Sequence, residues 1–389
     1  MTDVEIASGP RGRRYTRADD MTKVMVVFGT RPEVIKLAPV IAAIRDTARL
    51  TLTVVSTDQH AEMVQQMLEV FAIKPDHELG IMTAGQGLVD ITERALRGLA
   101  SVIAVEAPDV ILVQGDTTSA FAGALAGFYA GVTVGHVEAG LRTGDKSSPF
   151  PEEMNRRLIG ELADLHFAPT ERARENLLAQ GVAGPAITVT GNTIVDALAS
   201  VRHRAGETVR DMPALRGAGR LLAVTVHRRE SFGEPLRAIC RALRAIVERT
   251  PDVTLVFPVH RNPVLRETVF AELSGVPRLH LVDPLDYLTM IGLLGRAHLV
   301  LTDSGGIQEE AAALGVPALV LRDRTERTEG LLAGVARLVG TGTAAILEAA
   351  AELLGDPAAH AAMRHASDCY GDGRAAPRIV EALARGSRP

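Results

Sequence analysis

Acidic and basic side chains gather in one stretch of this chain, HVEAGLRTGDKSSPFPEEMNR, which ends at Arg156. It contains the carboxylates of Glu138 and Glu152 and the guanidinium of Arg142, and it begins at the end of an apolar run. If that run is a strand of a parallel sheet, these groups lie at its carboxyl end, where such folds bind their ligands. Carboxylates beside cations predict a site that transfers protons and holds an anion.

Glu138 directly follows the apolar run VTVGHV. A carboxylate there is costly to bury unless it is paired or protonated, and such burial suits it to proton transfer near neutral pH. The alternative is a structural salt bridge with Arg142 or Arg156. Of the tandem glutamates Glu152 and Glu153, one can point inward while the other caps a helix, and the sequence does not distinguish them.

Two more motifs follow apolar runs in the first half of the chain. GTRPE passes from a first strand into a helix, so Arg31 is predicted to lie at a helix N-terminus that attracts anions; an ordinary turn with a solvated arginine is the alternative. Lys36 lies one turn further along and faces either the site or water. In QGDTTSA, Asp116 is either a helix N-cap or a catalytic acid or base.

The second half carries HRRES and DSGGIQEE. His227 is a candidate for contacting a phosphate or acting as an acid, against the alternative of a structural histidine. Ser304, Gly305 and Gly306 predict a turn whose N–H groups wrap phosphate oxygens at a helix start, and Glu310 is spaced to meet ribose hydroxyls. A plain Ser/Gly helix cap is the alternative. The motif is neither a Walker loop nor a GxGxxG fingerprint, and no metal-ligand spacing is present.

Composition excludes several classes of protein. The chain has 389 residues and a formal net charge of −5, which argues against a nucleic-acid-binding or membrane-surface protein. Cys240 and Cys369 lie far apart without metal spacing, as expected of inert thiols in a reducing cytoplasm. RGRRYTR precedes an apolar run, VMVVF, that is too short for a signal peptide, and no run is long enough to span a bilayer.

Apolar runs alternate with amphipathic stretches from Val24 onward, which predicts parallel sheets covered by helices on both faces. Helices are expected at about 61–71, at 236–249 and from about 375. The predicted fold class is α/β, with two doubly wound Rossmann-like domains and an interdomain cleft. The predicted parts are a disordered N-terminal extension (1–20), an N-terminal domain with the catalytic carboxylates (21–198), a C-terminal domain (199–368) and a C-terminal helix (369–389).

Several motifs together carry a resemblance to a known family. GTRPEVIKLAPV, QGDTTSA, GHVEAGLRTGD, SPFPEE, HRRES, PVHRNP, TDSGGIQEEAAALGVP, RDRTER and YGDGRA occur in this order. From about Lys23 to Leu383 the chain resembles the UDP-N-acetylglucosamine 2-epimerases of the bacterial non-hydrolysing type. The resemblance is dense and covers almost the whole chain.

This resemblance implies a GT-B fold with the active site in the interdomain cleft, UDP bound by residues 199–368, and the segment 369–389 crossing back to the first domain. It implies interconversion of UDP-GlcNAc and UDP-ManNAc without a cofactor or metal. It also implies a homodimer in the cytoplasm, with no nucleic-acid or membrane partner.

Residue roles carried over from the family fall on matching motifs. Proton transfer at C2 of the sugar is implied for Asp116, Glu138 and Glu152. His227 is placed on the diphosphate side. The groups expected to hold the diphosphate, the sugar and the ribose are Arg31, Lys36, Arg156, Arg327, Ser304, Gly305 and Glu310. Many bacterial members bind UDP-GlcNAc at a second, activating site, which Gln59 and His260 match.

RDRTERTE departs from the usual family motif at Arg324 and Thr328, which adds a cation near the expected nucleotide site.

The chemistry predicts elimination and re-addition. The C2 hydrogen of a GlcNAc residue becomes acidic only when the C1–O bond to UDP breaks first or concurrently, which gives 2-acetamidoglucal. Three alternatives remain: a hydrolysing epimerase, separated by its products; a glycosyltransferase, which needs an acceptor groove; and a nucleotide-sugar binding protein, which the carboxylates at Asp116, Glu138 and Glu152 argue against. The pathway and the retention of allosteric activation stay open.

Overall fold

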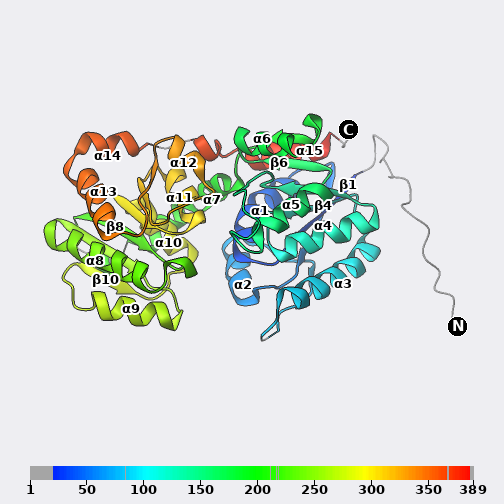
Figure 1. The fold of residues 1–389 in the computed structure, drawn as a ribbon. Coiled ribbons are helices and arrows are strands. Elements are labelled where there is room, and N and C mark those ends of the chain that lie inside the picture. The colour runs from blue at the N-terminus through cyan, green and yellow to red at the C-terminus, as the bar shows by residue number, and fades with distance from the viewer. Residues whose placement is uncertain are drawn as a thin grey trace. The chain divides into compact units, whose positions relative to one another are not determined.

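The computed structural model describes residues 21–83, 85–210, 212–215, 217, 219–365 and 368–385. Contacts within the chain divide it into two compact units. The first unit runs to Ala197 and also takes in the chain from Gly373, and the second runs from Leu198 to Asp372 (Figure 1). The N-terminal extension expected at residues 1–20 lies outside the described residues.

The first unit is built on a parallel sheet of seven strands among the described residues, in the order β3-β2-β1-β4-β5-β6-β7. The strands are β1 (Thr22–Phe28), β2 (Leu50–Ser56), β3 (His77–Glu78), β4 (Val110–Gln114), β5 (Thr133–Val137), β6 (Leu165–Ala168) and β7 (Ile187–Val189). The central strands β1 and β4 are almost wholly buried apolar runs, as expected when helices cover both faces of a sheet.

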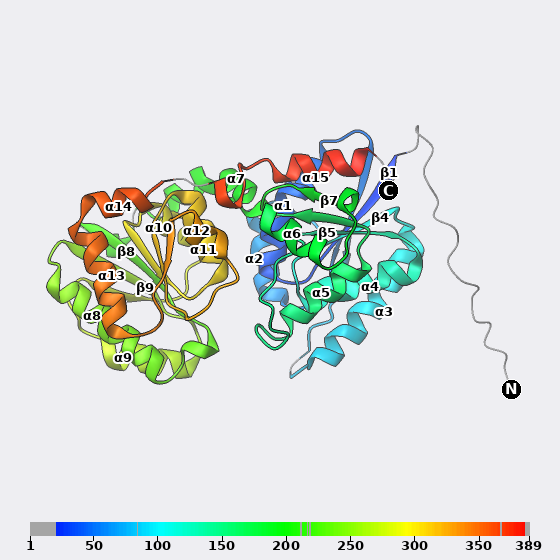
Figure 2. The same cartoon turned by 45° about the horizontal axis from the view of Figure 1, so that its top comes forward.

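The helices of this unit fall into two groups on opposite faces of the sheet (Figure 2). One group is α1 (Arg31–Arg45), α2 (Ala61–Val70) and α15 (Ala375–Ala384), and the other is α3 (Leu88–Glu106), α4 (Thr118–Ala130) and α5 (Glu152–Leu162). α6 (Glu171–Ala179) packs beside β6 and β7. Small residues let α4 lie close to the sheet, since a Cβ at Gly123 would lie 2.9 Å from a methyl of Val113.

The second unit repeats the plan with six parallel strands among the described residues, in the order β10-β9-β8-β11-β12-β13. The strands are β8 (Arg220–Thr225), β9 (Val253–Pro258), β10 (Leu279–Val282), β11 (Leu299–Thr302), β12 (Ala318–Val320) and β13 (Ala336–Leu338). The helices are α8 (Glu234–Arg249), α9 (Pro263–Leu273), α10 (Tyr287–Arg296), α11 (Gly305–Leu314), α12 (Thr328–Leu332), α13 (Thr343–Gly355) and α14 (Pro357–Met363).

The first unit is completed by the last helix of the chain. α15 packs on α1, and its first N–H groups, from Ala375 and Ala376, donate to the Asp196 carboxylate at 3.2 and 3.0 Å. Asp196 lies on α7 (Thr193–Thr208), the helix in which the chain passes from the first unit to the second. A carboxylate at a helix start satisfies N–H groups that have no acceptor within the helix.

The predicted α/β class with two parallel, doubly wound sheets is confirmed. Among the elements that the sequence analysis did not locate are the short strands β3 and β13 and the helices α3, α9, α10, α12, α13 and α14. The helices expected at 61–71, at 236–249 and from 375 occur as α2, as the greater part of α8 and as α15. No helix among the described residues is long and apolar enough to cross a membrane.

Candidate functional site

Two carboxylates of the first unit lie at the ends of neighbouring strands. Gly115 follows β4 with φ of +69°, in the left-handed region that favours glycine, and this turn places Asp116 beyond the strand. Glu138 follows β5 and also has a positive φ, +66°. A non-glycine residue in this region carries a conformational cost and is common at functional sites. The local fold therefore holds Glu138 in an unfavourable backbone conformation at the sheet edge.

Glu138 is buried and paired, but with a partner other than those considered from the sequence. Its Oε2 pairs with the Lys36 ammonium and accepts a hydrogen bond from Asn192 Nδ2 at 3.1 Å. Lys36 is therefore buried against the carboxylate and does not face water. The alternative of a structural salt bridge with Arg142 or Arg156 is wrong: Arg142 donates to Gln180 Oε1 at 2.6 Å, and Arg156 has the partners given next.

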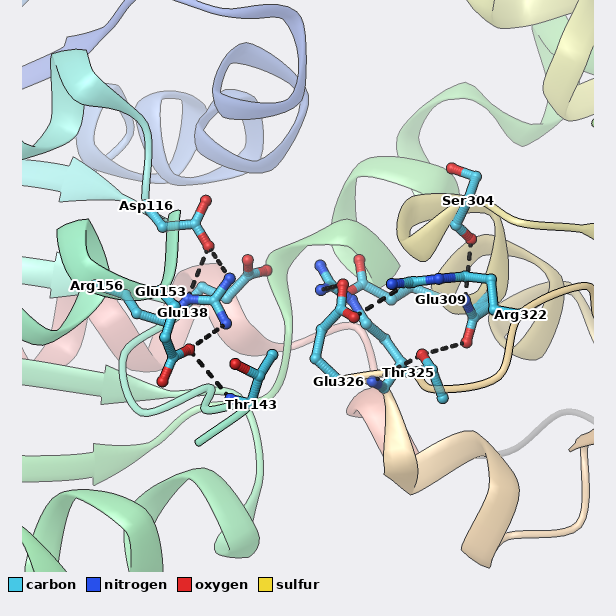
Figure 3. A network of polar contacts seen from close by, with 12 residues as sticks. Asp116, Glu138, Thr143, Glu153, Arg156, Ser304, Glu309, Arg322, Thr325 and Glu326 are labelled. Atoms are coloured by element: carbon cyan, nitrogen blue, oxygen red, sulfur yellow. Dashed lines mark hydrogen bonds and ion pairs between the residues drawn. The ribbon is translucent and has the colours of Figure 1, made fainter. Parts of the chain in front are cut away.

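Asp116 is paired with Arg156. The guanidinium donates to Asp116 Oδ2 from Nε at 3.0 Å and also from Nη2 (Figure 3). Asn155 Nδ2 donates to the Asp116 carbonyl at 2.9 Å. The alternative role as an N-cap is wrong, because Thr117 caps α4 by accepting from the Ala120 N–H at 2.9 Å. Asp116 stays about a quarter exposed, at 24% of its side chain, so a ligand can reach it.

The tandem glutamates at the start of α5 have different surroundings. Glu153 is fully buried and accepts from the Thr143 N–H at 3.1 Å, from Arg156 Nη1 at 3.2 Å and from Arg157 Nε at 3.0 Å. Glu152 is half-buried, and its Oε2 is enclosed without a hydrogen-bond partner among the described residues. A buried oxygen of this kind is costly unless it is protonated or meets a ligand donor. Glu153 is therefore structural, and Glu152 remains the predicted proton carrier.

Arg31 and Gln59 lie near the same edge of the first sheet. Arg31 is the first residue of α1 and is half-buried, directly after the capping residue Thr30. Gln59 is buried, and its Oε1 accepts from the Ser119 hydroxyl at 2.8 Å and from the Ser119 N–H at 3.3 Å. The Gln59 carbonyl oxygen is thus engaged at the first turn of α4, and its predicted allosteric role stays a prediction.

In the second unit Asp303 organises the candidate site. This fully buried carboxylate accepts from the N–H groups of His227 at 3.1 Å and Arg228 at 2.9 Å, and from the Ser231 hydroxyl at 2.9 Å. The His227 ring is partly exposed, with Nδ1 3.4 Å from Asp303 Oδ1, and it stacks on the exposed His260 ring with centroids 6.1 Å apart. The structure thus brings two predicted site histidines together.

The DSGGIQEE motif forms the start of α11 as predicted. The Ser304 N–H donates to Thr302 Oγ1 at 2.9 Å, so this N–H is engaged within the protein. Gly305 and Gly306 occupy the first turn of α11, where helix N–H groups have no acceptor within the helix. A Cβ at Gly305 would lie 3.1 Å from Arg327 Cζ, so glycine lets that guanidinium come close. Glu310 is buried on the same helix.

A network of arginines and glutamates surrounds Arg327. Its guanidinium donates to Glu309 Oε1 at 3.1 Å and to Glu326, and Arg322 donates to Glu326 Oε2 at 3.2 Å (Figure 3). Burial acts to raise the pKa of Glu326, but Arg327, Arg322 and Arg228 lower it to about 2. This carboxylate is therefore charged at neutral pH and holds the cations in place.

The two unusual motif positions lie close by in the chain. Arg324 is exposed in the segment between β12 and α12, and Thr328 begins α12.

Several residues of these networks were not among the predicted site residues. Asn192 and Asn155 hold Glu138 and Asp116, while Asp303 and Glu326 hold the His227 segment and Arg327. The signal for Asn192 was its place after the strand ITV in a TGNT run, which resembles the other strand-end motifs. Among the described residues no three His, Cys, Asp or Glu side chains gather as metal ligands would.

Comparisons with known proteins identify relatives of this chain. A family model described as UDP-N-acetylglucosamine 2-epimerase matches residues 42–384. The UDP-N-acetylglucosamine 2-epimerase of Escherichia coli (strain K12) is 49% identical over 368 residues, covering 93% of this chain and 98% of that protein.

Two solved structures show the same similarity. The UDP-GlcNAc 2-epimerase from Neisseria meningitidis bound to UDP-GlcNAc has a TM-score of 0.89 at 42% identity, covering 94% of this chain and 100% of that one. The enzyme from Methanocaldococcus jannaschii in complex with UDP-GlcNAc and UDP has a TM-score of 0.81 at 34% identity, with coverage of 94% and 100%. The resemblance carried by the motifs is confirmed.

Proposed function

The chain belongs to the UDP-N-acetylglucosamine 2-epimerase family of isomerases, and we propose that it interconverts UDP-GlcNAc and UDP-ManNAc by eliminating and re-adding UDP. In the forward direction the C1–O bond to UDP breaks, and the C2 proton passes to a protein carboxylate. The C1–C2 double bond forms, which gives 2-acetamidoglucal and UDP. A proton then reaches C2 from the opposite face while the diphosphate oxygen re-forms the bond to C1.

One observation carries this proposal. Two carboxylates, Asp116 and Glu138, follow neighbouring parallel strands, and each is paired with its own cation, Arg156 and Lys36. Proton addition to either face of C2 needs two acid or base groups near one carbon. Neighbouring strand ends in one sheet supply such a pair, and the enclosed Glu152 Oε2 adds a third oxygen that needs a proton or a ligand donor.

The leaving UDP needs positive charge and N–H donors around its phosphates. We assign this task to Arg31, Lys36 and Arg156 in the first unit. In the second unit we assign it to His227, Arg327, the hydroxyl of the N-cap residue Ser304 and the first turn of α11 at Gly305 and Gly306, with Glu310 on the ribose. The structures of relatives with UDP-GlcNAc and UDP support a nucleotide sugar as the ligand.

The test is incubation of the purified protein with UDP-GlcNAc in D₂O. We expect UDP-ManNAc with deuterium at C2, detected by NMR and mass spectrometry of the products. A folded preparation that shows no C2 exchange overturns the proposal. Free ManNAc accumulating with UDP identifies a hydrolysing enzyme instead.

The role of Glu138 is tested separately. Glu138→Gln should abolish deuterium exchange while UDP binding, measured by calorimetry, stays within about threefold of the parent value, because the amide keeps the shape but cannot take a proton. Full exchange activity in this variant would show that Glu138 is not a proton carrier. Lys36, which pairs with this carboxylate, loses its partner charge in the variant, so UDP binding also reports whether that ammonium stays in place.

We also propose that the protein is a homodimer. Besides the family resemblance, large apolar side chains on α3 and α4 are exposed, among them Val105, Phe128 and Tyr129. Light scattering coupled to gel filtration should give twice the chain mass of 41.3 kDa, and a mass of one chain at micromolar concentration would contradict it.

A further inference from the structure

Glu33 is a buried carboxyl group of the first unit that the proposed mechanism does not use. It is 0% exposed. Its Oε2 accepts from the N–H groups of Gly29 at 3.0 Å and Thr30 at 2.8 Å, and its Oε1 accepts from the Thr117 hydroxyl at 2.8 Å. These three hydrogen-bond donors are all neutral, so none of them balances the charge of a carboxylate, which is costly to bury.

These bonds join two segments that are 84 positions apart in the sequence. Gly29 and Thr30 lie between β1 and α1, directly before the candidate site residue Arg31. Thr117 lies between β4 and α4, directly after the candidate proton carrier Asp116. Glu33 therefore connects the segments that carry two site residues.

The Thr117 hydroxyl is held in one orientation. Its oxygen accepts from the Ala120 N–H at 2.9 Å, which caps α4, and its proton is donated to Glu33. A hydroxyl has one proton to give, so this geometry directs it at the carboxyl group.

The carbonyl groups just before Thr117 are held as well. His136 Nε2 donates to the Gly115 carbonyl at 2.7 Å, and Asn155 Nδ2 donates to the Asp116 carbonyl at 2.9 Å. A shift at Thr117 is therefore passed to Asp116 and cannot be absorbed by a loose turn.

We propose that Glu33 is a positioning residue for the reaction, which fixes Asp116 against the segment of Arg31 through the Thr117 hydroxyl. The inference rests on the proposed function, in which Asp116 carries a proton. Burial raises the pKa of Glu33 to about 7, although the hydrogen bonds from Thr117 and from the backbone N–H groups lower it. Burying a carboxyl group here is costly, and an apolar side chain in its place could not accept the hydrogen bonds that connect the two segments.

The test compares four single variants and one double variant by kcat and KM for epimerisation and by thermal midpoint. Thr117→Val removes the hydroxyl without changing the size of the side chain, and Thr117→Ser keeps it. Glu33→Gln keeps an acceptor for Gly29 and Thr30 but presents an amide N–H₂ to Thr117. Thr170→Val is the matched control, since Thr170 caps α6 through the Ala173 N–H at 3.1 Å in the same unit.

We expect kcat to fall about 10- to 100-fold in Thr117→Val and in Glu33→Gln, with KM within about twofold, because small misplacement of a catalytic group slows chemistry more than binding. The double variant, Thr117→Val with Glu33→Gln, should be no slower than the slower of its two single variants, since both substitutions break the same connection. Thr117→Ser should keep the parent kcat. Thr170→Val should lower the thermal midpoint as Thr117→Val does and keep the parent kcat.

Parent kcat in Glu33→Gln or in Thr117→Val overturns the inference, as does an equal kcat loss in Thr170→Val. If Thr117→Val does not fold, the kcat of Glu33→Gln decides. These outcomes are distinct from failure of the proposed function, which the parent protein alone reveals by the absence of C2 exchange in D₂O.

Discussion

The two units place an aspartate at the same point of the same fold and use it differently. β4 lies next to β1 in the first sheet, and β11 lies next to β8 in the second. Asp116 follows β4 after one glycine, and Asp303 follows β11 directly. Asp116 is partly exposed and paired with Arg156, whereas Asp303 is fully buried and accepts from backbone N–H groups and a hydroxyl.

The difference lies in which group connects the two segments at the strand ends. In the second unit Asp303 itself accepts from the N–H groups that follow β8, those of His227 and Arg228. In the first unit Glu33 makes the corresponding connection between the segments after β1 and β4, through Thr117. Because Glu33 serves there, Asp116 is left to pair with a cation and to meet a ligand. An equivalent position in the fold therefore does not decide the role of an aspartate. Its hydrogen-bond and ion-pair partners decide it.

The largest effect that would sharpen this comparison is expected for Asp116→Asn. The amide keeps the shape but cannot transfer a proton, so kcat should fall by about 10³-fold. The thermal midpoint should stay within a few degrees of the parent value. A variant with parent kcat would break the comparison, since Asp116 would then be structural like its counterpart.

The second prediction concerns the counterpart, Asp303→Asn. The donors from His227, Arg228 and Ser231 lie around Oδ2, and the His227 N–H also lies 3.2 Å from Oδ1, so in the amide one of these acceptor positions becomes an N–H₂ group that cannot accept. We expect the free energy of unfolding to fall by about 3 kcal/mol. Urea unfolding followed by circular dichroism measures this, because the chain has no Trp for fluorescence. Unchanged stability together with lost activity would contradict the structural role.

A third prediction uses His136, whose counterpart by strand register is the apolar Leu319. Burial lowers the pKa of His136 from 6.5 to about 3. The folded state therefore favours the neutral ring. The contribution of the neutral ring to the free energy of unfolding is complete above pH 6.5 and is lost as the pH falls toward 3.

At pH 5 this loss is about 2 kcal/mol. Urea unfolding at pH 7.5 and at pH 5 measures the free energy of unfolding at each pH. Between these two values it should fall by about 2 kcal/mol more in the parent protein than in His136→Gln. Equal losses in the two proteins would refute the assignment.

The smallest effect is expected for Gly115→Ala. Gly115 has φ of +69°, and a Cβ there would meet only Glu138 Oε1, at 3.9 Å, so space is available and only the backbone conformation is unfavourable. We expect a loss of about 1 kcal/mol in the free energy of unfolding. A much larger loss would mean that the turn before Asp116 has contacts beyond its conformation.

The sequence predicted the fold class, because apolar runs mark strands. It also predicted that candidate site residues follow those strands, because ligands bind at the carboxyl ends of parallel strands. It placed Asp116, Glu138, His227 and Ser304 within two positions of the ends of apolar runs, and the strands end there. A local signal was sufficient there, since each residue lies within two positions of the run that places it.

The sequence could not predict the pairings. Lys36 and Asn192 reach Glu138 from 102 and 54 positions away, and no local pattern encodes such contacts. Nor could it separate Glu152 from Glu153, since successive residues point about 100° apart around a helix and the roll of α5 decides which is buried. Nor could it show that α4 begins at Thr118, which makes Thr117 and not Asp116 its N-cap.

The packing of α15 on α1 has a consequence for biosynthesis. The Asp196 carboxylate accepts a hydrogen bond from the N–H of Ala376, which follows it by 180 positions in the sequence. During synthesis, every strand of the first sheet and the whole second unit are therefore translated before α15, which packs on α1, has left the ribosome. Until Gly373 and the residues after it emerge, the surface of α1 that packs on α15 stays uncovered. Completion of the enzyme waits for its final helix to arrive.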